Sequence, residues 1–138
     1  MTTATLERID TLRIDGPRLM ERLEAMARIG WKDNACCRLA LTDEDRDGRD
    51  LLVAWMKAAG LAVSIDPVGN IFGLRPGTDP AAAPVMTGSH IDTVRTGGKY
   101  DGNLGVLGGL EVAMALDDAG VKTRRGLVVA AFSNEEGA

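Results

Sequence analysis

The sequence predicts an α/β domain, a layered sheet with helices on its faces. Two observations carry this prediction. Segments with helical periodicity come before a strand, helix, strand pattern, and the last strand of that pattern, residues 127–132, is apolar at every position. Such a run is typical of a strand that is covered on both faces in a largely parallel sheet. The 138 residues are enough for one domain at most.

Two amphipathic helices are expected before residue 61. The first begins at Asp15, an N-cap residue followed by Gly16-Pro17, and ends at Gly30. Its apolar stripe is Leu19, Met20, Leu23, Met26 and Ala27. The second begins at Thr42, whose hydroxyl can cap the helix before an acidic first turn, and Gly60 ends it. Its buried stripe is Leu51, Leu52, Trp55, Met56 and Ala59.

A β-hairpin is expected next. Apolar residues alternate over 61–65, turn residues fill 66–70, and an extended run resumes over 71–74. A short strand at 85–89 then leads into His90. A glycine-rich stretch follows, and it opens into a third helix with an apolar face of Val106, Leu110, Ala113 and Met114.

Polar side chains gather at three places near strand ends or helix starts. They are His90 and Asp92, then Asp101, and finally Glu135 and Glu136. The third helix, about residues 103–119, runs roughly 25 Å away from Asp101. The strand after it, about residues 126–133, returns roughly 26 Å. A right-handed crossover therefore brings these side chains to one edge of the sheet.

One imidazole and four carboxylates at one place predict a metal centre. Four like charges would repel one another and oppose folding unless cations neutralise them. Two divalent ions suit this donor set, zinc or manganese first, with cobalt or nickel also possible. Asp92 can accept the second ring N–H of His90, because both residues lie on the same side of an extended chain. Asp101 could bridge two ions, while one of Glu135 and Glu136 ligates and the other takes a proton from water.

Each of these residues also has an ordinary alternative when it is considered alone. A histidine at a strand end is usually a hydrogen-bonded side chain, an acidic pair is usually a solvated loop, and Asp101 before Gly102 is usually a turn residue. Their convergence favours the metal centre. Phosphate binding is disfavoured, because Gly98-Lys99 is followed by Tyr100 and no GxGxxG motif occurs. No GxSxG motif surrounds Ser89, which disfavours a serine nucleophile.

Charge and composition exclude several classes of function. With 16 Lys and Arg against 20 Asp and Glu, the net charge is −4 without a basic stripe, so neither nucleic acid nor a membrane is an expected partner. The expected partner is a small molecule or a protein. The chain opens without the pattern of a secretory signal, so a cytoplasmic location is expected. Cys36 and Cys37 are adjacent, and they lack the spacing of a disulfide framework or of a reactive thiol.

Several motifs resemble a known family. They are GSHIDTV at 88–94, GGKYDG at 97–102, GV at 105–106, GLE at 109–111 and SNEEG at 133–137. Together with residues 38–45 and 68–70, they are similar to the amidase, hydantoinase and carbamoylase branch of the dinuclear metallopeptidase-like hydrolases, over roughly residues 16–138. That branch includes N-carbamoyl-L-amino-acid hydrolases, allantoate amidohydrolases and β-ureidopropionases. Tyr100-Asp101-Gly102 favours this branch over the peptidases of the same clan.

The resemblance implies a role for each candidate residue. His90 would ligate the first metal ion, Asp101 would bridge both ions, and Glu136 would ligate the second. Glu135 would be the general base, and Asp92 would orient His90. The implied reaction is hydrolysis of a linear amide C–N bond in a ureido group, in an N-carbamoyl-L-amino acid or allantoate, with release of ammonia and carbon dioxide.

The resemblance also implies a longer protein. Members of the family carry further histidine ligands, a substrate-binding arginine and a smaller lid domain that dimerises. Residues 1–138 are therefore expected to form the N-terminal segment of the catalytic domain of a homodimeric enzyme, and to be inactive alone. Two alternatives stay open: a dinuclear aminoacylase or peptidase of the same clan, and a catalytically silent fragment that acts as a binding module.

Overall fold

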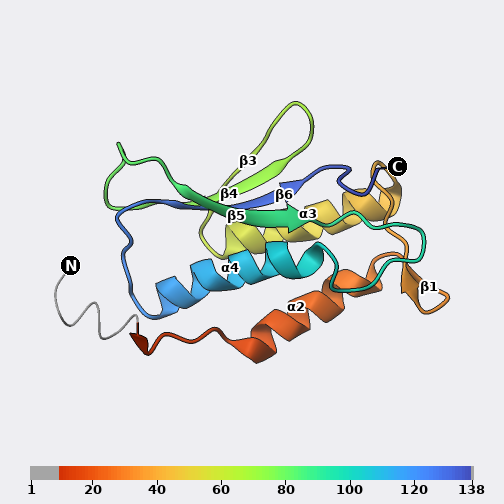
Figure 1. Cartoon of the computed structure of the whole chain (residues 1–138), viewed down its shortest axis with the longest axis horizontal. Helices are drawn as coiled ribbons and strands as arrows, with labels where there is room; N and C mark the ends of the chain where they lie inside the picture. Colours follow the sequence, from red (N-terminus) through yellow and green to blue (C-terminus); the bar gives the residue numbers. More distant parts are fainter. Residues whose placement is uncertain (1–9, 138) are drawn as a thin grey trace.

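The computed structural model describes residues 10–137 of the chain. Three helices are α2 (Gly16–Arg28), α3 (Asp43–Ala58) and α4 (Asn103–Asp118). The strands are β1 (Trp31–Lys32), β2 (Ala35–Cys36), β3 (Ala62–Ile65), β4 (Ile71–Arg75), β5 (Val85–His90) and β6 (Leu127–Phe132). The α/β prediction is confirmed. Figure 1 shows the layers, with α4 lying between the sheet and α2.

The four longer strands form one sheet in the order β3-β4-β6-β5. β5 and β6 run parallel, and α4 is the expected crossover between them. β3 pairs antiparallel with β4, and β4 pairs antiparallel with β6. The prediction of a largely parallel sheet is therefore wrong. The turn at 66–70 and the loop at 76–84 each reverse the chain, so only the pair connected through a helix keeps one direction.

β6 lies inside the sheet, between β4 and β5. Its four central residues, 128–131, are all buried, as the continuous apolar run predicts. Val129 and Ala131 belong to the core that the sheet shares with the helices. Because side chains alternate along a strand, the residues between them point to the opposite face.

The starts of α2 and α3 confirm the predicted caps. Asp15 accepts a hydrogen bond from the main-chain N–H of Arg18 at 3.0 Å, and Thr42 accepts one from Asp45 at 3.3 Å. Each bond satisfies a donor that the first turn of a helix leaves without an intrahelical partner. None of the helices within residues 10–137 is both long enough and apolar enough to cross a bilayer.

The apolar stripes are narrower than predicted. Met20 is 42% exposed and does not belong to the stripe of α2. It follows Leu19 directly, so it points about 100° away around the helix. In α3, Leu52 and Met56 are fully buried, whereas Leu51, Trp55 and Ala59 are only half-buried.

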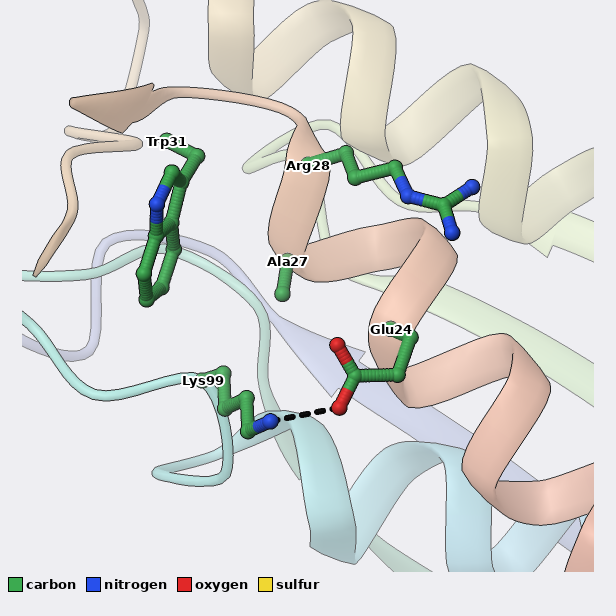
Figure 2. Close-up of a pocket in the computed structure, with 5 residues that line it drawn as sticks. All are labelled: Glu24, Ala27, Arg28, Trp31 and Lys99. Atoms are coloured by element: carbon green, nitrogen blue, oxygen red, sulfur yellow. Dashed lines mark hydrogen bonds and ion pairs between the residues drawn. The ribbon is translucent and has the colours of Figure 1, made fainter. Parts of the chain in front are cut away.

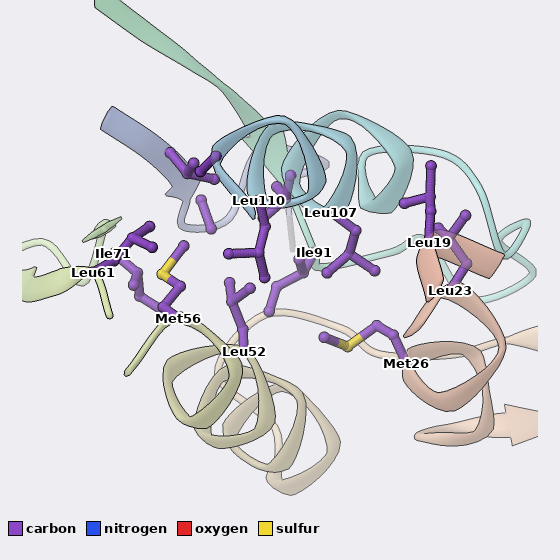
Figure 3. Packing of buried hydrophobic residues seen from close by; sticks show 14 residues of the cluster. Leu19, Leu23, Met26, Leu52, Met56, Leu61, Ile71, Ile91, Leu107 and Leu110 are labelled. Carbon is purple, nitrogen blue, oxygen red and sulfur yellow. The ribbon is translucent and has the colours of Figure 1, made fainter. Parts of the chain in front are cut away.

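The core joins the three helices to the sheet. Leu52 and Met56 of α3 pack with Leu107 and Leu110 of α4, and Figure 3 shows these side chains gathered around the space between the helices. Ile91 follows β5 directly and is 1% exposed. Its burial in this cluster anchors the residues on either side of it, His90 and Asp92.

A small hairpin, β1–β2, follows α2 and was not predicted. Its turn consists of Asp33 and Asn34, which have positive φ angles of 50° and 61°. Two such residues in succession match a tight hairpin turn, for which Asp and Asn are favoured. The Asp33-Asn34 dipeptide is the sequence feature that could have predicted this turn, although the strands around it are only two residues long.

Candidate metal centre

Three side chains from separate segments meet at the carboxyl ends of β5 and β6. His90 is the last residue of β5, Asp101 lies in the turn before α4, and Glu136 follows β6. One ligand atom from each lies within 4.8 Å of the other two, the one group of this kind in residues 10–137. The β5–α4–β6 crossover thus brings together residues that are distant in the sequence.

The His90 ring is oriented through its Nδ1 atom. Nδ1 lies 3.0 Å from the main-chain carbonyl oxygen of Asp92, which can accept its proton. On the other side of the ring, Nε2 lies 3.4 Å from Oε2 of Glu135 and 4.0 Å from Oδ1 of Asp101. Donation from Nδ1 leaves the lone pair on Nε2, where a metal ion can bind.

The Asp92 carboxylate has different partners from those expected. Its Oδ1 atom is 3.7 Å from Nδ1 of His90, too far for a good hydrogen bond. The two carboxylate oxygens instead accept the main-chain N–H groups of Glu135 at 3.3 Å and Glu136 at 3.1 Å. Asp92 therefore contacts the His90 ring with its carbonyl group and holds the loop after β6 with its carboxylate.

The turn that carries Asp101 packs directly against His90. The N–H of Asn103 donates to the carbonyl oxygen of Asp101 at 2.6 Å and closes the turn. Gly102 has a φ of 65°, and a Cβ atom there would lie 2.5 Å from Cε1 of His90. Only glycine combines this backbone conformation with such a close approach. The side chain of Asp101 is 73% exposed, beside the Nε2 edge of the ring.

A pocket lies on the α2 side of the same turn. It is lined by Glu24, Ala27, Arg28, Trp31 and Lys99 (Figure 2). The ammonium group of Lys99 forms an ion pair with Glu24, drawn as a dashed line. The pocket contains none of the candidate metal ligands. Its contribution to the centre is this ion pair, which connects the turn before Asp101 to α2.

The carboxylates of the centre have no strongly basic partner within residues 10–137. In the part of the chain that the structure describes, neither Lys nor Arg forms an ion pair with Asp101, Glu135 or Glu136; His90 alone approaches the first two. Neighbouring carboxylates repel one another, and a divalent cation relieves that repulsion. One imidazole with several carboxylate oxygens fits zinc or manganese. The donor set therefore fits a divalent metal ion.

Three fully buried polar side chains were not predicted. Arg38, Asn103 and Glu111 are each 0% exposed. Glu111 accepts two hydrogen bonds from the guanidinium of Arg18, at 2.7 and 2.8 Å, and one from the N–H of Asp15 at 2.9 Å. Its position on the apolar face of α4 was a usable signal, because a carboxylate is buried only when it is paired.

Comparison with known proteins places this chain in a family. Residues 70–138 match the model of peptidase family M28. The chain belongs to peptidase family M28. Over 127 residues, this M28 chain is 48% identical to the N-carbamoyl-L-amino-acid amidohydrolase of Rhizobium meliloti, covering 91% of the chain and 30% of that protein. It is also 38% identical, over 127 residues, to the ureidoglycolate hydrolase of Arabidopsis thaliana, covering 91% of the chain and 27% of that protein. The M28 chain thus spans about 30% of the length of these curated relatives.

Solved structures agree with the sequence matches. A hydantoinase/carbamoylase family amidase from Burkholderia ambifaria superposes with a TM-score of 0.90 at 53% identity, over 92% of the M28 chain and 32% of that chain. The aminopeptidase PepT of Bacillus cereus, with a TM-score of 0.69 at 16% identity, shares the fold. The resemblance to the amidase, hydantoinase and carbamoylase branch is confirmed, and the family is metal-dependent.

Proposed function

We propose that this chain carries part of the catalytic centre of a metal-dependent amidohydrolase that cleaves linear amide C–N bonds in ureido groups. The convergence of His90, Asp101 and Glu136 within 4.8 Å of one another is the observation that carries the proposal. N-carbamoyl-L-amino acids are the favoured substrates, because relatives named for that activity are 39–48% identical to the chain. Allantoate and other ureido compounds are further candidates.

Five residues have defined tasks in this proposal. His90, through Nε2, and Glu136 would each hold one divalent ion, and Asp101 would be a ligand shared by both. Bound divalent ions would supply Lewis acidity, which polarises the scissile carbonyl and acidifies the attacking water. Glu135, 3.4 Å from Nε2 of His90, takes the proton of that water and passes it to the leaving nitrogen. Asp92 holds Glu135 and Glu136 in register through their main-chain N–H groups.

The proposed centre needs more ligands than these residues supply. Each zinc or manganese ion takes at least about four donors, and three ligating side chains leave two ions short. We therefore expect the 138 residues alone to bind metal weakly and to release no ammonia. The same proposal describes a cytoplasmic homodimer that acts on a small molecule, without nucleic acid or membrane as a partner. The free, adjacent Cys36 and Cys37 suit a reducing compartment.

Metal titration is the first test of the proposal. The natively expressed protein is stripped of metal and titrated with Zn²⁺ and Mn²⁺, next to Asp101→Ala and a control variant, Asp50→Ala. Asp50 is an exposed acidic residue of α3, outside the centre. We expect Asp101→Ala to lose metal and Asp50→Ala to retain it. Absence of a divalent site in the unaltered protein would instead favour a catalytically silent binding module.

Substrate competition is the second test. The intact mass of the natively expressed protein is determined first. The protein is then incubated with N-carbamoyl-L-amino acids, allantoate, N-acetyl amino acids and dipeptides. Ammonia release from the first two, abolished by a chelator, supports the amidohydrolase. The family model is that of a peptidase, so an aminoacylase or peptidase is the second candidate function. Preference for N-acetyl or dipeptide substrates would establish it.

A further inference from the structure

Arg38 is a fully buried arginine next to the proposed metal centre. It lies between β2 and α3 and is 0% exposed. Its Nε atom donates to the carbonyl oxygen of Ile91 at 2.7 Å. A terminal nitrogen donates to Oδ1 of Asn103 at 3.0 Å. The other terminal nitrogen donates to the carbonyl oxygens of Met26 and Ile29, at the end of α2, at 2.9 and 2.8 Å.

Two of these acceptors belong to the segments that carry the proposed metal ligands. Ile91 stands between His90 and Asp92, so its carbonyl group is part of the chain that places both side chains. Asn103 is the first residue of α4, and its N–H closes the turn on the carbonyl oxygen of Asp101 at 2.6 Å. One rigid guanidinium group therefore connects the end of β5 to the turn that carries Asp101.

The main chain of Arg38 strengthens the same connection. Its N–H donates to Oγ1 of Thr93 at 2.8 Å, and its carbonyl oxygen accepts the N–H of Thr93 at 2.8 Å. In α3, a Cβ atom on Gly48 would lie 2.8 Å from Cδ of Arg38, so a side chain there would displace the arginine. The segment after His90 is thus held by both the side chain and the main chain of this residue.

The burial of Arg38 is unfavourable for the stability of the fold. Within residues 10–137 no carboxylate forms an ion pair with it, so carbonyl and amide oxygens and the Sγ atom of Cys36 receive its donors. Burying a cation without an ion-pair partner is costly, and an apolar side chain of similar volume avoids that cost. An apolar side chain cannot hold the end of α2, β2, the segment after β5 and the start of α4 at hydrogen-bond distances, as the guanidinium does.

We propose that Arg38 is a positioning residue for the metal centre, which sets the separation of His90 and Asp101 through its bonds to Ile91 and Asn103. The inference rests on the proposed metal-dependent function. Arg38 acts through the main chain of one ligand segment and the side chain at the start of the other. When the donors of Arg38 are lost, all the ligands are still present, but the separation of His90 and Asp101 is no longer fixed.

A matched pair of variants tests this inference in the natively expressed protein. Arg38→Met removes the donors and leaves an unbranched apolar side chain that is shorter and slightly smaller in volume. Arg75→Met is the control, because Arg75 is also buried and bonds to Asp117 and Val121, but its strand pairing with Leu127 puts it at the opposite end of β6 from the centre. Zn²⁺ affinity is measured by competition with a chelator, Co²⁺ geometry by visible absorption, and stability by thermal unfolding.

Both variants are expected to lower Tm, but only Arg38→Met should weaken Zn²⁺ binding, by roughly 10- to 100-fold, and alter the Co²⁺ bands. Unchanged Zn²⁺ affinity in a folded Arg38→Met protein, or an equal loss in Arg75→Met, overturns the inference. Should Arg38→Met not fold, Asn103→Ala and Asn103→Asp are compared by the same two readouts. Both variants lose the bond from Nδ2 to the carbonyl oxygen of Lys99, but only Asn103→Ala loses the acceptor of the guanidinium, so it should lose more Zn²⁺ affinity. If the unaltered protein binds neither Zn²⁺ nor Co²⁺, the proposed metal function itself fails.

Discussion

Oδ2 of Asp92 accepts the main-chain N–H of Glu136 at 3.1 Å, which joins the segment after β5 to the segment after β6. The neighbouring Oδ1 atom accepts the N–H of Glu135 at 3.3 Å. A buried carboxylate thus holds two acidic residues by their backbone while their side chains stay available for chemistry. This contact is the structural link between the two halves of the centre.

Asp92→Asn tests that link. The amide keeps the size of the carboxylate but turns one acceptor into a donor, so one of the two N–H groups loses its partner. We expect metal affinity to fall by roughly 10- to 100-fold, as happens when groups behind a metal ligand are altered. Calorimetric titration with Zn²⁺ measures it. An unchanged affinity would mean that the loop after β6 keeps its position without Asp92.

Glu135→Gln separates proton transfer from metal binding. In the natively expressed protein, the proposed function predicts that this variant keeps its metal, because Glu135 is not among the proposed ligands, and loses turnover by roughly 10²- to 10⁴-fold. Metal content by elemental analysis and ammonia release measure the two effects. Glu136→Gln is the comparison and should lose metal. Turnover that survives in Glu135→Gln would reject its assignment as the base.

Glu111→Gln should destabilise the fold without altering the metal centre directly. The buried carboxylate of Glu111 bonds to Arg18 at 2.7 Å and joins α4 to α2. Weakening a buried pair of this kind costs about 2–4 kcal/mol. Asp118→Asn removes the exposed partner of the same arginine and should cost less than about 1 kcal/mol. Urea unfolding of the two variants compares them; equal losses would contradict the distinction between buried and exposed partners.

Asp45→Asn should raise Tm at neutral pH. Burial raises the pKa of the Asp45 carboxyl above its ordinary value of 3.8. The folded state then holds this proton more tightly than the unfolded state, so the associated stability is present below 3.8 and is lost as the pH rises through the folded value. Asparagine avoids the buried charge and keeps an acceptor for the N–H of Leu41.

Thermal unfolding as a function of pH checks this expectation. The advantage of Asp45→Asn should be present at neutral pH and disappear below pH 3.8, where the Asp45 carboxyl of the unaltered protein is protonated and uncharged. Asp43→Asn, at an exposed position in the same helical turn, should show no such advantage. A lower Tm for Asp45→Asn at neutral pH would show that its charge stabilises the helix start more than burial opposes it.

Two glycines of one segment should respond in opposite ways to alanine. Gly102→Ala forces a Cβ atom against His90 and an unfavourable φ, so metal binding should be lost. Gly108 lies inside α4 with nothing within 4 Å of an added Cβ atom, so Gly108→Ala should raise stability by up to about 1 kcal/mol. Metal titration and urea unfolding of both variants distinguish these effects. Normal metal binding in Gly102→Ala would contradict the close packing.

Features that depend on neighbouring residues were predictable from the sequence. Asp15 and Thr42 begin their helices because capping needs only a side chain and the next turn. The meeting of His90 with Asp101 and Glu136 was also predictable, because helix and strand lengths fix where a crossover returns. Strand direction was not, since it depends on how the loop at 76–84 turns.

The contacts of buried polar residues were harder to predict from the sequence. Arg38 lies outside any periodic segment, and its partners Ile91 and Asn103 are more than fifty positions away in the sequence. Local spacing favours a bond between the Asp92 carboxylate and His90, whereas in the structure the carboxylate accepts the main-chain N–H groups of Glu135 and Glu136. Such contacts depend on tertiary packing, which no local pattern describes.

The strand order also determines when the sheet can form during synthesis. β4 and β5 are not neighbours, because β6 lies between them and pairs with both. Before β6 has left the ribosome, the β3–β4 hairpin is the only pairing in this sheet that can form, and the remaining pairings must wait for contacts of long sequence separation. The Asp92 contact to Glu135 and Glu136 waits for the same strand. The two halves of the centre therefore assemble in the step that completes the sheet.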